Sequence, residues 1–220
     1  MKKCILILIF LVLAHVYLAG QREAEGETPQ LVFPEFTQAR ILMKSGQVQT
    51  QMMNYNSITE TMVYIRGNNH YELTNPVIVD TVFMQGSKFI PVKGAFYEVL
   101  DRGDMPLFLQ VKSELKPVGK DAGYGSTSHT SATTTYSSYS ASGLNYNLKL
   151  PPDYTVETSY IYWINKTVSF ETERQFLKLF PEKEDELKAF IKKNRYKFDN
   201  KESIIAVVKY CAGLYKSTTP

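Results

Sequence analysis

The stretch VIVDTVFMQGSKFIPV, residues 77–92, decides the fold class. It contains two short runs rich in Val, Ile and Phe, and the tripeptide Gln85-Gly86-Ser87 separates them. β-Branched and aromatic side chains suit a pleated sheet, and Gly accepts the positive backbone angles of a tight turn. Strands joined by so short a turn can only be antiparallel neighbours. The stretch therefore predicts a β-hairpin.

The same pattern recurs on both sides of this hairpin. Further strand pairs are predicted within residues 39–55, 61–73 and 95–112, where Gly46, Gly67 and Gly103 mark the turns. No helix-length period interrupts the pattern before about residue 115. Residues 38–170 are therefore expected to form an antiparallel β-meander.

A last hairpin is predicted within TSYIYWINKTVSFE, residues 158–171, with its turn at Asn165-Lys166. Alternation places one set of bulky side chains on one face and a second set on the other: Tyr160, Tyr162 and Ile164 against Ile161 and Trp163. Two bulky faces indicate a sheet that is covered on both sides or curls on itself. We expect a curved sheet or a partial barrel.

The pattern becomes helical in residues 171–216. Thr172 and Gln175 fit a capping box, Pro181 suits a first helical turn, and Asp199-Asn200 resembles a further helix start. Apolar stripes follow at helical spacing: Leu187, Phe190 and Ile191, then Ile204, Ile205, Val207, Val208 and Cys211. The expected fold class is therefore α+β, with two or three short C-terminal helices packed on the sheet or on one another.

The first 20 residues have the layout of a secretory signal peptide. Lys2 and Lys3 precede an apolar run, and Ala19-Gly20 supplies a small-residue cleavage region. A retained membrane anchor is the alternative, but a spanning helix needs about 20 predominantly apolar residues. Gln21 stands where a lipoprotein would carry its acylated cysteine. We expect an exported protein that is periplasmic, associated with an outer membrane or secreted, with no transmembrane span after cleavage and a flexible leader over 21–37.

Charge and cysteine content exclude some classes of partner. The formal net charge is only +3, and two lysines leave with the signal peptide, so no general attraction to nucleic acid is expected. Cys211 is the only cysteine after cleavage, which rules out an intrachain disulfide in the mature chain. Its helical apolar pattern predicts a buried thiol.

Residues 123–142, within an excursion at 120–143, are dominated by Ser and Thr. Long loops of this composition are usually disordered or functional. Three interpretations remain open: a mobile excursion between two strands, an edge hairpin on the sheet, or a patch that binds a ligand or carries glycans. We favour the exposed excursion.

The residues give little support for catalysis or a cofactor. Only His70 and His129 remain after cleavage, and no spacing typical of a zinc, nucleotide or hydrolase motif occurs. Glu98, Asp101 and Asp104 gather near one turn, where an acid pair of the glycosidase type is conceivable but a solvated turn is the favoured interpretation. No catalytic residue, metal ligand or cofactor is predicted.

The chain resembles uncharacterised secreted or envelope proteins of Bacteroidota in residues 52–56, 77–92, 94–100 and 174–211. The resemblance implies a compartment but no activity. It also implies one modification, because such exported proteins can be O-glycosylated at Asp-Thr followed by an aliphatic residue. Asp80-Thr81-Val82 has that form, which makes Thr81 a candidate.

Two classes of function remain open, with a structural envelope role beside them. We favour a non-catalytic protein that binds an envelope protein, a glycan or an apolar small molecule through aromatic side chains. The candidate contact residues are Tyr124, Tyr136, Tyr139, Tyr160, Tyr162 and Trp163. The alternative is an extracytoplasmic hydrolase with an unrecognised acid pair or Ser/His site.

Overall fold

A computed structural model describes residues 28–118, 120–121, 127–128, 148–150 and 154–216. The expected signal peptide, residues 21–27 of the expected leader, and Tyr124, Tyr136 and Tyr139 lie outside the described residues. Within these ranges, no helix has the length and apolar character needed to cross a membrane.

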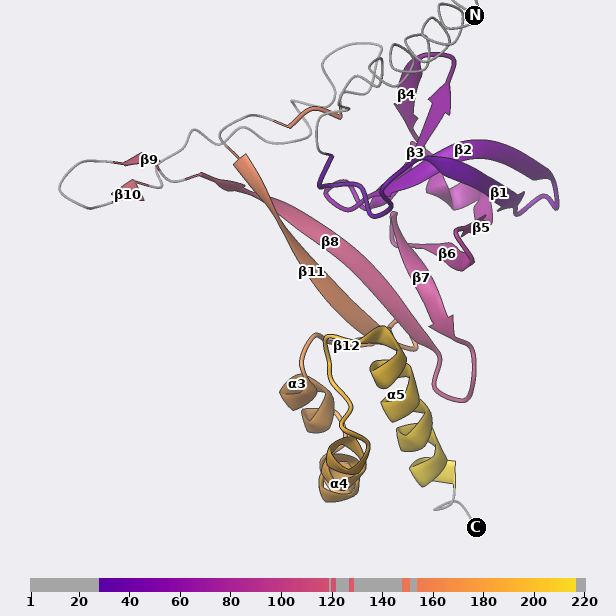
Figure 1. Ribbon diagram of the computed structural model, residues 1–220. Helices are drawn as coiled ribbons and strands as arrows, with labels where there is room; N and C mark the ends of the chain where they lie inside the picture. The colour runs from indigo at the N-terminus through magenta and orange to yellow at the C-terminus, as the bar shows by residue number, and fades with distance from the viewer. Residues whose placement is uncertain (1–27, 119, 122–126, 129–147, 151–153, 217–220) are drawn as a thin grey trace, which may run out of the picture.

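Ten strands form one open antiparallel sheet, which confirms the predicted fold class (Figure 1). The strands are β1 (Thr37–Met43), β2 (Val48–Asn56), β3 (Thr61–Arg66), β4 (Asn69–Glu72), β5 (Val79–Met84), β6 (Ser87–Val92), β7 (Ala95–Asp101), β8 (Leu107–Pro117), β11 (Tyr154–Ile164) and β12 (Val168–Phe170). Their order is β12-β11-β8-β7-β6-β5-β1-β2-β3-β4. β9 (Lys120–Asp121) and β10 (Thr127–Ser128) form a separate pair.

The sheet consists of two meanders joined through β1 and β5. β1 pairs with β2 on one side and with β5 on the other, where Ile41 lies opposite Val82. β4 therefore ends at one margin of the sheet, and the chain must cross to reach β5. The connecting segment contains the 3₁₀ helix η1 (Pro76–Ile78).

The curvature of the sheet brings the turn between β2 and β3 against β7 and β8. The Phe96 amide donates to the Glu60 carbonyl at 2.9 Å, and the Ser113 amide donates to the Ser57 carbonyl at 2.8 Å. The ring of Tyr55 in β2 stacks on that of Phe89 in β6 at a centroid distance of 6.0 Å, although β1 and β5 lie between these two strands in the sheet. The core lies inside this curve.

Three α-helices end the described chain, as predicted: α3 (Glu173–Lys178), α4 (Glu184–Asn194), which follows the 3₁₀ helix η2 (Pro181–Lys183), and α5 (Lys201–Lys216). The capping box is present, because the Thr172 hydroxyl accepts from the Gln175 amide and the Gln175 side chain accepts from the Thr172 amide. The Asn200 side chain accepts from the Ser203 amide at 2.7 Å, which caps α5.

The helices share one apolar core with the sheet. They lie together near β12 and the start of β8, at one end of the molecule (Figure 1). Phe170 of β12 contacts the ring of Phe176 in α3 at a centroid distance of 5.0 Å. Cys211 is fully buried in the same cluster, as predicted.

The ordered contacts begin before the expected end of the leader at residue 37. Gln30 is fully buried, the Val32 amide donates to the Tyr55 carbonyl at 2.9 Å, and the Asn54 side chain donates to the Phe33 carbonyl at 2.8 Å. Residues 28–36 thus pack along β2, because the buried side chain of Asn54 supplies hydrogen bonds that an apolar residue there could not.

Candidate functional site: a groove on the concave face

A groove of about 470 Å³ lies on the concave face of β1, β2 and β3. Residues 72–75 and 78–79, from the end of β4 through the crossing segment to the start of β5, complete its wall. The groove therefore exists because β5 returns beside β1 and the chain has to cross the end of the sheet.

The floor of the groove is apolar. Opposite residues of antiparallel strands share one face of a sheet, and Met53 lies opposite Tyr64. Ile41, Met53 and Val79 are buried, with relative exposures of 6% or less. Met43, Leu73 and Ile78 continue the apolar surface toward the wall. The ring of Tyr64 is half-buried and lines the same hollow.

The rim of the groove is polar, and most of its side chains form no hydrogen bond within the described chain. Four rim side chains form no hydrogen bond or ion pair with any other part of the described chain: Gln49, Arg66, Thr74 and Asn75. Gln51 donates its amide to the Ile65 carbonyl at 2.8 Å, which leaves its side-chain oxygen available. The rim thus presents donors and acceptors to whatever enters the groove.

Two further side chains shape the environment of the rim. The ring of Tyr71 stacks on Tyr64 at 5.5 Å with an interplanar angle of 22°, which supports the Tyr64 ring from the neighbouring strand. Burial raises the pKa of the Glu72 carboxyl, while a hydrogen bond with Thr59 opposes this shift. Burial has the larger effect because the carboxylate loses water on entering the wall of the groove.

The aromatic residues predicted as a contact surface do not form one surface. Tyr160 is 55% exposed, whereas Tyr162 is 4% exposed and stacks on Phe170 inside the core. Trp163 lies on the opposite face of β11, half-buried against Tyr97, and its indole N–H donates to the Gln110 side-chain oxygen at 2.8 Å. Only Tyr160 of these three presents most of its ring to a partner.

Thr81, the candidate for O-glycosylation, lies within β5. Its side chain is buried, with 4% relative exposure for the residue, and its hydroxyl donates to the Asp80 carboxylate at 2.7 Å. The folded chain therefore does not present this hydroxyl at its surface.

The acidic residues considered for a hydrolase each pair with a lysine of α5. Glu98 pairs with Lys201 at 2.8 Å, Asp101 with Lys209 at 3.1 Å and Asp104 with Lys216 at 2.6 Å. The three carboxylates thus fasten a helix to β7 and its following turn.

The described residues include few candidates for histidine catalysis or metal binding. His70 lies in β4 with its ring 5.1 Å from that of Phe36, and His129 lies outside the described residues. No group of three or more potential metal ligands occurs in the residues that the structure describes.

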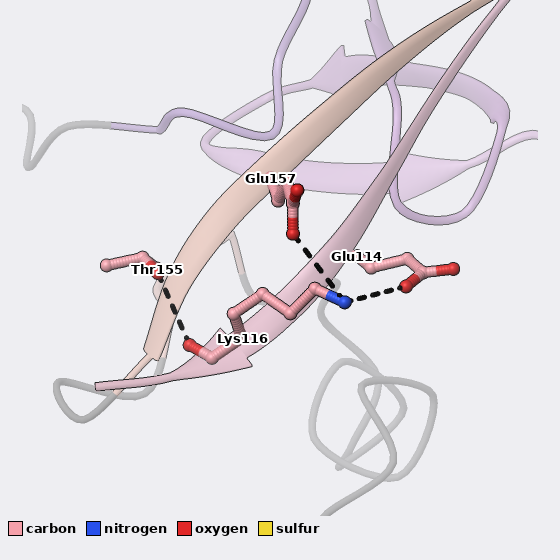
Figure 2. Close-up of polar contacts among 4 residues, drawn as sticks. All are labelled: Glu114, Lys116, Thr155 and Glu157. Atoms are coloured by element: carbon pink, nitrogen blue, oxygen red, sulfur yellow. Dashed lines mark hydrogen bonds and ion pairs between the residues drawn. The ribbon is translucent and has the colours of Figure 1, made fainter. Parts of the chain in front are cut away.

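The long ribbon formed by β8 and β11 carries an exposed charge cluster (Figure 2). Lys116 lies between Glu114 at 3.3 Å and Glu157 at 3.6 Å, and the Thr155 hydroxyl donates to the Lys116 carbonyl at 3.4 Å. The hydrogen bond and charge of Glu114 raise the pKa of Lys116. All three charged side chains are about half exposed or more, so these pairs stabilise the ribbon only weakly.

Reasoning from the sequence missed the groove, although one local signal was present. Gln49 and Gln51 occupy the same face of β2 as Met53 and Tyr55, which belong to the core. Polar side chains on a face that is otherwise apolar indicate that this part of the face meets solvent or a ligand. The wall of the groove had no such signal, because it depends on which strand β5 joins.

Comparison with known proteins does not assign a family or a function to the chain. No protein-family model matches the chain, and no curated protein or solved structure shows significant similarity to it.

Proposed function

We propose that this protein is an exported, non-catalytic binding protein whose ligand occupies the groove on the concave face. The observation that carries the proposal is the combination of an apolar floor with polar rim side chains that have no internal partner. Ligand sites commonly have volumes of roughly 300–1,000 Å³ and combine such a floor with a few polar groups. The groove meets both conditions.

The arrangement of titratable groups favours binding over hydrolysis. An acid pair needs two carboxyl groups that face one reacting bond. Glu98, Asp101 and Asp104 each engage a lysine instead, and Glu72 is the only acidic residue among the described residues that line the groove. Export is supported by the signal-peptide layout of residues 1–20 and by the resemblance to secreted proteins of Bacteroidota.

Native mass spectrometry of protein purified from the envelope and medium of its own host tests the proposal. We expect a mature chain that begins at Gln21 and carries extra mass, which is released on denaturation. Met43→Trp should abolish this mass because the larger ring fills the groove. Leu42→Trp is the matched control, since the side chain of Leu42 points to the other face of β1.

Three results would contradict the proposal. A chain of bare mass from both fractions would remove the support for a retained ligand. Equal retention in Met43→Trp and Leu42→Trp would place the ligand elsewhere. A chain that still carries residues 1–20 would contradict export by signal cleavage.

A further inference from the structure

We propose that the ligand of the groove is a glycan, an inference that rests on the proposed function above. Hydrogen-bonding side chains reach the groove from β2, β3 and the crossing segment. Those on the groove face of the strands, with two from the crossing segment, are Gln49, Gln51, Arg66, Thr74 and Asn75. A ligand in the groove displaces their water and must replace those hydrogen bonds on several sides at once. Saccharides carry hydroxyl groups around the whole ring and meet this requirement.

The groove carries little charge. Of the described lining residues, only Arg66 is charged and shares the face of Tyr64, because Glu72 lies opposite Val63 and so belongs to the other face of the β3–β4 pair. A polyanion would gain one ion pair here, and a polycation would gain none. A neutral ligand with many hydroxyl groups can accept from Arg66 and form further hydrogen bonds with Gln49, Gln51 and Asn75.

The floor offers a surface for the apolar face of a sugar ring. The Tyr64 ring lines the groove beside Met53, and Tyr71 backs it from β4. The C–H bonds of a pyranose form a flat apolar face, while its hydroxyl groups lie at the edge. An aromatic or apolar floor within a polar rim matches both parts of such a ring.

Two other classes of ligand fit less well. An amphiphile with a single polar head would leave most of the rim without hydrogen bonds. An extended peptide binds by adding to a free strand edge, but β1, β2 and β3 each pair with strands on both sides. The floor therefore offers no free backbone edge, and side chains alone must recognise the ligand.

Binding of the mature protein to an array of defined oligosaccharides tests the inference. Titration calorimetry then measures the affinity for the oligosaccharide that gives the strongest array signal. We expect Gln49→Ala to weaken its binding about tenfold, the effect of losing one hydrogen bond of ordinary strength. Gln47→Ala is the matched control, because Gln47 is exposed on the same hairpin and does not line the groove.

A second pair of variants tests the aromatic floor. Tyr64→Leu and Tyr71→Leu each break the same stacked pair by removing one of its two rings. Of the two residues, only Tyr64 lines the groove. We expect a loss of about tenfold or more in affinity for Tyr64→Leu and a smaller loss for Tyr71→Leu. Circular dichroism of both variants checks that the sheet has formed.

The outcomes separate this inference from the proposed function. If a peptide array or oleate gives binding that Met43→Trp abolishes, and no oligosaccharide does, the groove binds a ligand but the glycan inference is wrong. If none of these probes binds and no mass is retained from the host, both proposals are wrong. Oligosaccharide binding that is unchanged in Gln49→Ala and Tyr64→Leu would overturn the placement of a glycan in this groove.

Discussion

Glu98 is the most deeply buried of the three carboxylates that hold α5. Its side chain is 11% exposed, the Ser87 hydroxyl donates to it at 2.6 Å, and Lys201 contacts both of its oxygens. The other two pairs are more exposed, and the pair of Asp104 with Lys216 is more than half exposed at both partners. The three pairs thus offer a graded comparison along one helix.

Replacement of these lysines by methionine should destabilise the protein in the order of burial. Lys201→Met leaves the Glu98 carboxylate with one donor in a water-poor site and should cost about 1–3 kcal/mol. Lys216→Met should cost less than about 0.5 kcal/mol because water screens the exposed pair. Lys209→Met should fall between them. Urea unfolding measures the three free energies, and equal values would contradict the structural ranking.

Cys211 shows how burial alters the chemistry of one atom. Loss of water raises the pKa of its thiol to about 12, against an ordinary value of about 8.5. The reactive thiolate is therefore scarce in the folded chain at pH 8.

We expect Cys211 to resist a thiol reagent until the protein unfolds. In a Cys4→Ser chain, where it is the only cysteine, the dye-forming reaction with a disulfide reagent should be at least about a hundredfold slower in native buffer than in concentrated urea. The folded and unfolded rates are compared at the same pH. Similar rates would mean that α5 opens readily from the sheet.

At the scale of elements, the local sequence predicts the turns best. Gln85 and Gly86 have φ of 52° and 77°, the left-handed conformation of a tight hairpin turn. The turn residues predicted at Gly46, Gly67 and Asn165-Lys166 also have positive φ. Lys93-Gly94, between β6 and β7, has the same geometry but was not predicted.

Two glycine substitutions should therefore have opposite effects. Gly86→Ala places a Cβ on a left-handed residue and should destabilise the protein by about 1 kcal/mol. Gly213→Ala lies in α5 with open space around the new methyl group, and it should stabilise by about 0.5–1 kcal/mol. Chemical denaturation of both variants provides the test. A stabilising Gly86→Ala would contradict the turn geometry.

The sequence predicted the elements better than their arrangement. Hairpins and the capping box at Thr172 depend on neighbouring residues, so local patterns carry them. The pairing of β1 with β5 joins segments about 40 residues apart, and several strand orders bury the same apolar faces. The groove depends on that pairing. This is why the groove left a local trace in the sequence only at Gln49 and Gln51 of β2.

At the scale of the whole molecule, one core explains why the predicted tyrosine surface is divided. The helices cover the face of β11 that carries Tyr162 and Ile164, and both side chains become core residues. Tyr160 lies further along the ribbon and stays exposed. A run of aromatic residues in a strand does not reveal which part of it another element will cover.

Because the core is continuous, the sheet and the helices should unfold together. Trp163, the only tryptophan, reports on β11 by fluorescence, while far-ultraviolet circular dichroism reports mainly on α4 and α5. We expect both signals to give one urea transition with the same midpoint, as in two-state unfolding. A chain ending at residue 170 exposes Phe170, Tyr162 and Ile164, so it should not form the native sheet. If the helical signal is instead lost at a lower urea concentration than the fluorescence changes, residues 171–216 form a separate unit. The lysine pairs of α5 would then be the main attachment of that unit to the sheet.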